Sequence, residues 1–581
     1  MSNDQASKAR QRMGKCFYRI APKDFKIIPG SPIVYWASSE ALKAFDELPV
    51  EAHFDAKKGM AIGDNARFLR AWAEISHSAI EFGARGPKDT YEKKWYPCLN
   101  GGPFRKWSSN KEFVVNWNSD GLEPKRTITE KTGDHWSRYI ISTGYFFKPG
   151  INWTAISSSS YSARLHPAGF AFTSASMAAF ASDNDVGTLL CLVNSKVGKY
   201  YLSLLSPTLN YGIAELKKIP LLDVSNYKDV SLLVDNLARG FSDDWDSYET
   251  SWDFSGSPFL TTKFHSATLE ASYQRLRCYW SEMTLEMQRL EEENNRIFID
   301  AYSLREELTP EVPLEEITLI CNPAYRYGGN ASVEDREIRL RADTVAEFLS
   351  YAVGCMFGRY ALDKPGLILA NQGETIEDYL KQIPEPSFRA DDDNVIPMLD
   401  GDWFSDDISD RFREFLRITF GDKHYDENLR FVEQALGKDI RKYFLKDFYN
   451  DHVRRYKKRP IYWLFSSPKG SFNALIYMHR YRPDTVGVVL NDYLREFRTK
   501  LTSRRDHLEA VSISANASSG EKTKALKDIE KISKIIVELD DYERDVLYPL
   551  ATKQVEIDLD DGVKVNYPKF GHALKKITGL S

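Results

Sequence analysis

The sequence of 581 residues has no run of about 18 apolar residues, and no apolar segment follows its polar start, MSNDQASKARQRMGK. The first absence excludes a membrane-spanning helix, and the second argues against a secretory signal peptide. We therefore expect a soluble, cytoplasmic protein that makes no membrane contact. Apolar residues form 42% and charged residues 28% of the chain, which is ordinary for globular proteins and excludes global disorder.

Cysteine is scarce, and its spacing does not suit a metal site. No two cysteines form a CxxC pair, and no histidine lies beside one at metal-ligand spacing. We interpret the cysteines as small buried apolar residues in a reducing compartment and predict no metal ion. The six are Cys16, Cys98, Cys191, Cys278, Cys321 and Cys355.

Signature motifs of several enzyme classes are also absent. The chain has no GxxxxGK[ST] loop for nucleoside triphosphates, no HExxH for zinc and no GxSxG for a serine nucleophile. Asp484 and Glu496 are the only hint of a metal-dependent nuclease, and their surroundings, LNDYLREFRTKL, predict a helix rather than the required strand. A degenerate nuclease is therefore the weakest hypothesis.

The segment Asn322-Pro323-Ala324-Tyr325 is similar to a catalytic loop. Adenine amino-methyltransferases use Asn/Asp-Pro-Pro-Tyr to hold the target amino group and to stack on a flipped base. Here Ala324 replaces the second proline. No glycine-rich turn from strand to helix precedes it to hold S-adenosylmethionine, since GMAIGDN and LNGGPF lack the right flanks. We predict a turn, no catalytic residue and no cofactor in this chain.

The length predicts about four domains. Short aromatic segments separated by Gly, Asn and Ser predict many short strands between residues 55 and 224. Helical patterns dominate afterwards, including an amphipathic helix in SEMTLEMQRLEEENNRIFIDAYSL and a small polar loop, SISANASSGEKTK, between two helices. The predicted fold is therefore α+β and multidomain, with a mixed, β-rich domain before a large, mostly helical C-terminal region. The expected parts are 1–35 (a junction), 36–224 (β-rich), 225–345 (a helical spacer), 346–485 and 486–581 (both helical).

Net charge is −5, which by itself argues against nucleic acid, but segment 93–138 has the opposite charge. It holds nine Lys and Arg against five Asp and Glu, interleaved with aromatic residues. Such a surface suits phosphate neutralisation and base stacking, although buried tryptophans with solvated charges would give the same pattern. The residues in and near this segment that we expect at DNA are Arg105, Lys106, Trp107, Asn116, Lys125, Arg126, Arg138 and Arg164.

A second cationic run places five cations within six residues, just before PIYWLF. It could contact a DNA backbone or an acidic partner, or it could be a helix C-terminus, where cations are favoured. Its members are Arg454, Arg455, Lys457, Lys458 and Arg459.

Eight distinctive segments lie in order along nearly the whole chain: FKIIPGSPIVYWAS (25–38), GMAIGDNARFLR (59–70), KWYPCLNGGPFRKWSSNKEFVVNW (94–117), LVNSKVGKYYLSLLSPTLNYGIAELKKIP (192–220), NPAYRYGG (322–329), SYAVGCMFGRYALDKPGLILANQGE (350–374), KRPIYWLFSSPKGSFNALIYMHRY (458–481) and DDGVKVNYPKFG (560–571). Together they resemble the adenine-specific DNA methyltransferases of BREX phage-defence systems, the PglX type.

The resemblance implies that this chain corresponds to the part after the catalytic domain. Residues 1–35 would then be a junction, and 36–224 would be similar to the target-recognition domains of type I specificity subunits. The S-adenosylmethionine site would lie in the other half of such an enzyme. The implied partners are double-stranded DNA, a methyltransferase catalytic domain or subunit, and other BREX components. Charge complementarity adds acidic inhibitors that mimic DNA.

Two functions remain open at this stage. The favoured one is a DNA-recognition module that gives sequence specificity to an adenine-N6 methyltransferase and is inactive alone. The alternative is an assembly or scaffold subunit, because the helical part, 225–581, is larger than recognition of a short site requires.

Overall fold

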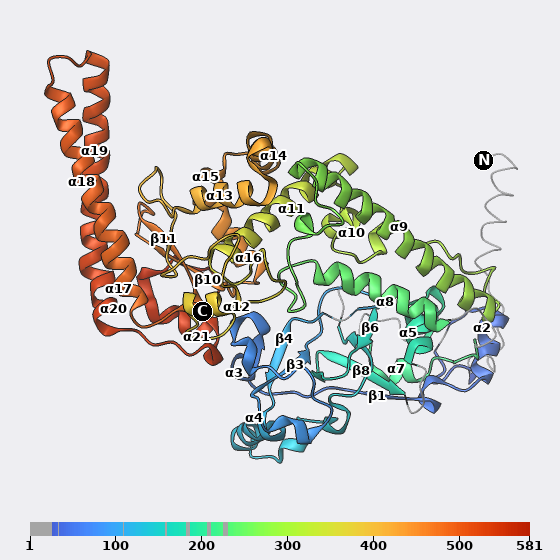
Figure 1. Ribbon diagram of the computed structural model, residues 1–581. Helices are drawn as coiled ribbons and strands as arrows, with labels where there is room; N and C mark the ends of the chain where they lie inside the picture. Colours follow the sequence, from blue (N-terminus) through green and yellow to red (C-terminus); the bar gives the residue numbers. More distant parts are fainter. Residues whose placement is uncertain are drawn as a thin grey trace, which may run out of the picture. The chain divides into compact units, whose positions relative to one another are not determined.

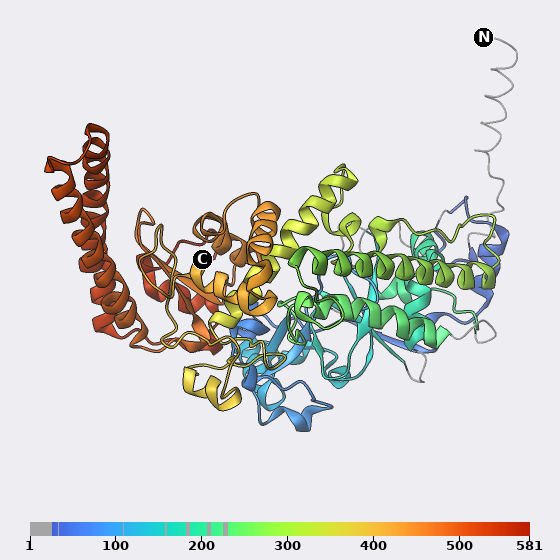
Figure 2. The ribbon, with the colours of Figure 1, turned by 45° about the horizontal axis from the view of Figure 1, so that its top comes forward.

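The computed structural model describes residues 26–32, 34–108, 110–156, 160–181, 186–205, 211–224 and 230–580. Most of the expected junction, 1–35, lies outside these ranges. The chain forms two compact units (Figures 1 and 2). Unit 1 contains Met1–Phe68, Glu81–Asp244 and Ser281–Gly328, and unit 2 contains Leu69–Ile80, Trp245–Trp280 and Gly329–Ser581.

Two small sheets lie at the centre of unit 1. One is antiparallel with the order β1-β8-β5-β6, and in the other β3 pairs antiparallel with β4 and parallel with β7. The predicted series of short strands is confirmed. The strands are β1 (Phe54–Lys57), β3 (Trp95–Leu99), β4 (Phe113–Asn116), β5 (Gly150–Thr154), β6 (Ala163–His166), β7 (Ala171–Phe172) and β8 (Ser176–Ala181).

Helices complete unit 1. Helix α2 begins behind Ser38, whose side chain accepts a hydrogen bond from the backbone N–H of Ala41. Helix α5 is buried over its last six residues and packs against β5 and β6. The helices are α2 (Ser39–Lys43), α3 (Asn65–Phe68), α4 (Asn118–Thr132), α5 (Val186–Asn194), α6 (Lys196–Leu205), α7 (Ile213–Lys217), α10 (Pro323–Tyr327), most of α8 (Val230–Asp246) and the second part of α9 (Leu269–Ala301).

The long helix α9 confirms the amphipathic pattern of the sequence. Its apolar residues Leu290 and Ile297, seven positions apart, are buried, while Glu293 and Arg296 between them are at least partly exposed. The helix therefore presents one face to a core, as its periodicity requires.

Unit 2 is mainly helical but also holds a three-stranded sheet, β10-β11-β9, that was not predicted. Its hairpin strands pair antiparallel from Tyr462↔Tyr477 to Ser466↔Asn473, around a turn containing Gly470. The strands of this sheet are β9 (Ile396–Pro397), β10 (Tyr462–Ser466) and β11 (Asn473–Tyr477), and β2 (Leu69–Ala71) is not part of it. The helices are α11 (Val333–Met356), α12 (Ile376–Gln382), α13 (Ile408–Phe420), α14 (Tyr425–Leu436), α15 (Ile440–Tyr443), α16 (Tyr449–Arg455), α17 (Thr485–Val488), α18 (Glu496–Ile513), α19 (Ser519–Tyr542), α20 (Tyr548–Lys553) and α21 (Val563–Asn566).

The cysteines mostly match their predicted role. Cys98, Cys191, Cys321 and Cys355 are buried and form no disulfide, whereas Cys278 is exposed, which corrects the expectation for that residue. Cys16 lies outside the described part of the chain. Within that part, no three His, Cys, Asp or Glu side chains come together in a way that would hold a metal ion, and no helix has the length and apolar character to cross a membrane.

Candidate nucleic-acid interface

Most aromatic side chains of segment 93–138 lie inside unit 1. Trp95, Trp107 and Trp117 are each at most 1% exposed, and Trp117 packs edge-on against Phe146. Trp136 is only partly buried and lies under the Lys125 ammonium, 4.6 Å from it. The tryptophan concentration is therefore mainly a structural core and not a stacking surface.

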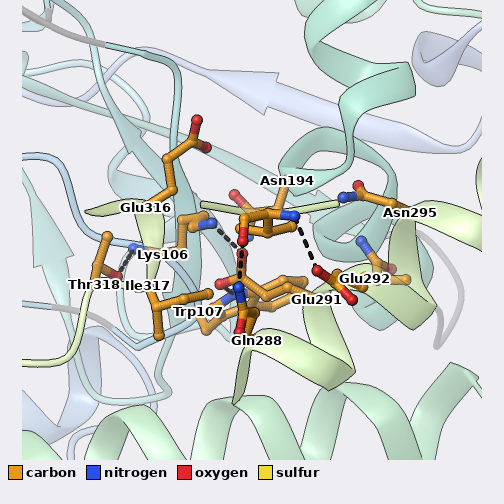
Figure 3. A network of polar contacts seen from close by, with 12 residues as sticks. Lys106, Trp107, Asn194, Gln288, Glu291, Glu292, Asn295, Glu316, Ile317 and Thr318 are labelled. Atoms are coloured by element: carbon orange, nitrogen blue, oxygen red, sulfur yellow. Dashed lines mark hydrogen bonds and ion pairs between the residues drawn. The ribbon is translucent and has the colours of Figure 1, made fainter. Parts of the chain in front are cut away.

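The loop 104–108 is fixed by a buried ion pair (Figure 3). The Lys106 ammonium donates to the Glu291 carboxylate of α9, and the indole N–H of Trp107 donates to the other oxygen of Glu291 at 2.8 Å. The backbone N–H of Lys106 donates to the Thr318 hydroxyl at 3.0 Å. Burial lowers the pKa of the Lys106 ammonium, and the Glu291 charge opposes this effect. One carboxylate thus holds two neighbouring side chains of the loop.

Arg105, in the same loop, contacts α8 in a similar way. Its guanidinium donates to the backbone carbonyl of Phe241 at 2.7 Å and lies 3.9 Å from the Asp244 carboxylate. Asp244 also accepts hydrogen bonds from the backbone N–H groups of Ile320 and Cys321, at 2.6 and 3.0 Å. Burial raises the pKa of Asp244, while Arg105 and these amides act in the other direction.

Two further predicted residues are buried in the sheets. Arg164 on β6 has no exposed surface and donates to the Thr154 hydroxyl at 2.8 Å, and burial lowers its pKa to about 10. Asn116 at the end of β4 is 4% exposed, and its amide donates to the Glu123 carboxylate at 2.8 Å.

A side chain without accessible surface cannot touch phosphates or base edges. Four of the residues expected at DNA are at most 3% exposed, and they instead hold the elements of unit 1 together. This corrects the expectation for Arg105, Lys106, Trp107 and Arg164, whereas Asn116, which is 4% exposed, still lines a surface hollow described below.

Three of the cationic side chains expected at DNA remain accessible, and all three lie on or just after α4. Arg126 is 63% exposed and Arg138 71%, each beside a carboxylate four residues away in sequence. Lys125 is less accessible because it pairs with Asp120 at 2.7 Å and lies over aromatic rings. Arg126 and Arg138 therefore have the freedom to exchange a surface carboxylate for a phosphate or a base.

A hollow of about 370 Å³ lies beside the start of α4, and we call it the cationic hollow. It combines three cations, two amides and Leu122, whose side chain is 63% exposed. One of its carboxylates, Glu123, is already paired with Arg67. Its lining residues are Glu92, Lys93, Lys94, Asn116, Asn118, Leu122, Glu123 and Arg126.

Sequence reasoning had missed Lys93, Lys94, Asn118 and Leu122 as parts of this site. The available signal was an isolated leucine within a polar, glycine- and proline-containing stretch, NSDGLEPKR. A single exposed apolar side chain among donors suits contact with a thymine methyl group.

The entry to α4 has an unusual backbone. Ser119, Asp120 and Gly121 all have left-handed conformations, with φ of 53°, 54° and 69°. Such a conformation is unfavourable for the first two residues, which have a Cβ. A Cβ at Gly121 would lie 2.8 Å from the Trp117 ring, so glycine is required there. This turn lies directly before the helical residues of α4, which include Leu122 and Arg126, and it therefore fixes where the helix begins.

The second cationic run ends α16, as its helix-terminus interpretation predicts. Arg455 pairs with the buried Glu249 at 3.0 Å, and Arg459 pairs with the buried Glu74 at 2.9 Å. Arg454 is 76% exposed beside Asp451. The two lysines of the run, Lys457 and Lys458, are exposed and have left-handed φ values of 51° and 64°. Arg455 and Arg459 are thus structural, while Arg454, Lys457 and Lys458 are at the surface.

The Asn322–Tyr325 segment is a helix cap. The Asn322 side chain accepts from the N–H of Ala324 and donates to the carbonyls of Leu314 and Ile317. The Tyr325 hydroxyl donates to the backbone carbonyl of Phe104. Both polar groups are engaged, and Pro323–Tyr327 form the short helix α10, so the segment expected to be a turn is the start of a helix.

The glycines of GMAIGDN and LNGGPF do not form the turn between a strand and a helix that would bind S-adenosylmethionine. Gly101 and Gly102 follow β3, but the next regular element is the strand β4, whereas the cofactor motif needs a helix. A Cβ at Gly102 would lie 2.2 Å from the Asn110 amide, so protein fills the space. Gly59 lies close to the backbone carbonyl of Thr173, where a Cβ would be 2.3 Å away. These glycines serve close packing.

Comparison with known proteins identifies clear relatives, although no family model matches the chain. It is 34% identical over 590 residues to the adenine-specific methyltransferase BrxX of Escherichia coli O9:H4 (strain HS). It is 35% identical over 581 residues to the adenine-specific methyltransferase PglX of Lacticaseibacillus casei (strain Zhang). Each match covers 97% of this chain and 46% of the relative. The chain is homologous to these methyltransferases along nearly its whole length and spans about half of theirs.

Proposed function

We propose that this homologue of the BREX adenine-specific methyltransferases is the target-recognition and C-terminal part of such an enzyme. It binds duplex DNA and selects the sequence at which adenine is methylated at N6 in phage defence. The observation that carries this proposal is the 34–35% identity to two adenine-specific methyltransferases over 97% of the chain. S-adenosylmethionine and the catalytic residues would belong to the remaining half of the enzyme.

The cationic hollow supports the DNA-binding part of the proposal. Arg126 can donate two hydrogen bonds to a guanine, and Leu122 offers an apolar contact for a thymine methyl group. Lys93 and Lys94 add positive charge at the same hollow. The buried pairs of Lys106 and Arg105 fix the loop between β3 and β4 to the rest of unit 1. A rigid scaffold of this kind favours accurate placement of the contacting residues.

Duplex binding measured over a series of salt concentrations tests this function. If the chain contacts six to ten phosphates, its affinity should fall by about 10³- to 10⁵-fold between 50 and 200 mM salt, because each contact releases condensed counterions. Fluorescence anisotropy with a mixed-sequence duplex of about 30 base pairs gives the slope. An affinity that stays constant over this range would contradict DNA binding by phosphate contacts.

A further inference from the structure

The helices α18 and α19 form an antiparallel hairpin within unit 2, which we call the arm (Figures 1 and 2). The two helices pack through apolar residues at coiled-coil spacing. Leu501 and Leu508 on α18 are seven residues apart, and so are the buried residues Ala525, Ile532 and Leu539 on α19. One face of α19 is thus used for packing, and its other faces need no partner within the hairpin.

The base of the arm is fixed. Glu538, which is 7% exposed, accepts hydrogen bonds from the Ser467 and Ser471 hydroxyls, both at 2.6 Å, and from the backbone N–H of Lys469 at 2.7 Å. All three donors belong to the turn between β10 and β11. Within the arm, Arg498 of α18 pairs with Asp540 of α19 at 2.7 Å and holds the two helices together at this end. The arm therefore has a defined direction within unit 2.

Four lysines form a stripe along the exposed side of α19. At 3.6 residues per turn, Lys524, Lys527, Lys531 and Lys534 fall within an arc of about 80°. All four are exposed. Within the part of the chain that the structure describes, only Lys534 has a recorded ion pair, with Glu530, and both of its members are about two-thirds exposed or more. We call this set the lysine stripe.

Repulsion between the lysines of the stripe opposes helix formation, and Asp528 and Glu530 at the same spacing offset part of it. Each neighbouring pair of these lysines is three or four residues apart, and like charges at this spacing destabilise a helix by about 0.2–0.5 kcal/mol. A solvated face usually mixes both signs of charge along such a row. Here Asp528 and Glu530 lie beside the row, but the row itself holds four exposed cations, which suits an anionic partner.

We propose that the lysine stripe binds the phosphates of duplex DNA, in addition to the contacts of the cationic hollow. The stripe extends over about 15 Å of helix, and the same length of duplex presents about nine phosphates. Lysine ammonium groups on flexible stems neutralise phosphates without selecting bases. The stripe then contributes affinity and salt dependence but no sequence preference. This inference rests on the proposed function, because it needs a chain that binds DNA.

The test is the quadruple variant Lys524→Gln/Lys527→Gln/Lys531→Gln/Lys534→Gln. Glutamine keeps the helix propensity and removes the charge, so the arm should stay folded. The plot of log affinity against log salt should become less steep by about 3–4, because each lost phosphate contact contributes about 0.9 to the slope. The ratio of affinities for different sequences should stay unchanged.

The matched control replaces four exposed lysines of unit 2 outside the arm: Lys364→Gln/Lys381→Gln/Lys423→Gln/Lys442→Gln. It removes the same charge from the same unit and should change the slope by less than about 1. If the natural chain binds DNA and both variants keep its slope, the stripe does not contact DNA, and this inference alone is overturned. If both variants lose slope equally, the effect is general charge, which also overturns it. If the natural chain does not bind duplex DNA at all, the proposed function fails first.

Discussion

Replacing Glu291 by leucine should lower the free energy of unfolding of unit 1 by about 3–5 kcal/mol. Glu291 is 4% exposed, and the Lys106 ammonium that it neutralises is 1% exposed. Without the carboxylate, a positive charge stays buried with no counter-charge, and the Trp107 indole loses its acceptor. Both changes leave polar groups without partners in the interior, where they cost more than at the surface. Chemical denaturation followed by far-UV circular dichroism measures the loss.

Two variants separate the buried charge from general damage. Lys106→Met/Glu291→Leu removes both charges and should recover most of the lost stability, because a buried ion pair can often be exchanged for apolar residues. Glu286→Ala on the same helix breaks an exposed pair with Arg289 and should change stability by less than about 0.5 kcal/mol. A loss of under about 1 kcal/mol for Glu291→Leu alone would contradict the structural role assigned to this pair.

Arg126→Ala should relax sequence preference. If Arg126 contacts a guanine from the cationic hollow, its removal should cost about 1–3 kcal/mol of binding free energy on the preferred site, a loss of affinity of roughly 5- to 150-fold. The loss of affinity for other sequences should be much smaller. Selection of bound duplexes from a randomised pool, followed by affinity measurement on the recovered site, gives both quantities. Arg126 is 63% exposed, so the fold should tolerate the change.

The control for Arg126 is Arg138→Ala. Arg138 is 71% exposed beside Asp134 and does not line the hollow. As a backbone contact at most, it should weaken binding to all sequences alike and lower the salt slope by about 1. Equal behaviour of the two variants on all sequences would remove the base-contacting role from Arg126.

Local patterns in the sequence predicted local structure well. The short strands between 55 and 224 and the long helix α9 follow from turn residues and apolar periodicity. The hairpin of β10 and β11 was missed because its strands are almost fully buried and so lack the alternation that marks a strand. The left-handed turn before α4 was missed because Ser119 and Asp120 rarely adopt that conformation.

The candidate site was harder to predict because its contacts are distant in sequence. Lys106 pairs with a residue 185 positions away, and Arg105 bonds to one 136 positions away. A cation that meets a buried carboxylate looks the same in sequence as one that faces solvent. Arg126 and Arg138 are exposed in the structure, and their contact with DNA stays a prediction.

The most direct measurement of the central claim is transfer of labelled methyl groups from S-adenosylmethionine to mixed-sequence duplex DNA. It is made with this chain alone, with a separately produced catalytic half from the same kind of methyltransferase, and with both together. We expect no transfer by the chain alone and site-selective transfer on mixing, which Arg126→Ala should make less selective. Transfer by the chain alone would contradict the account, because it would require a cofactor site within these 581 residues. Mixing that leaves transfer absent or unselective would contradict the role in target recognition.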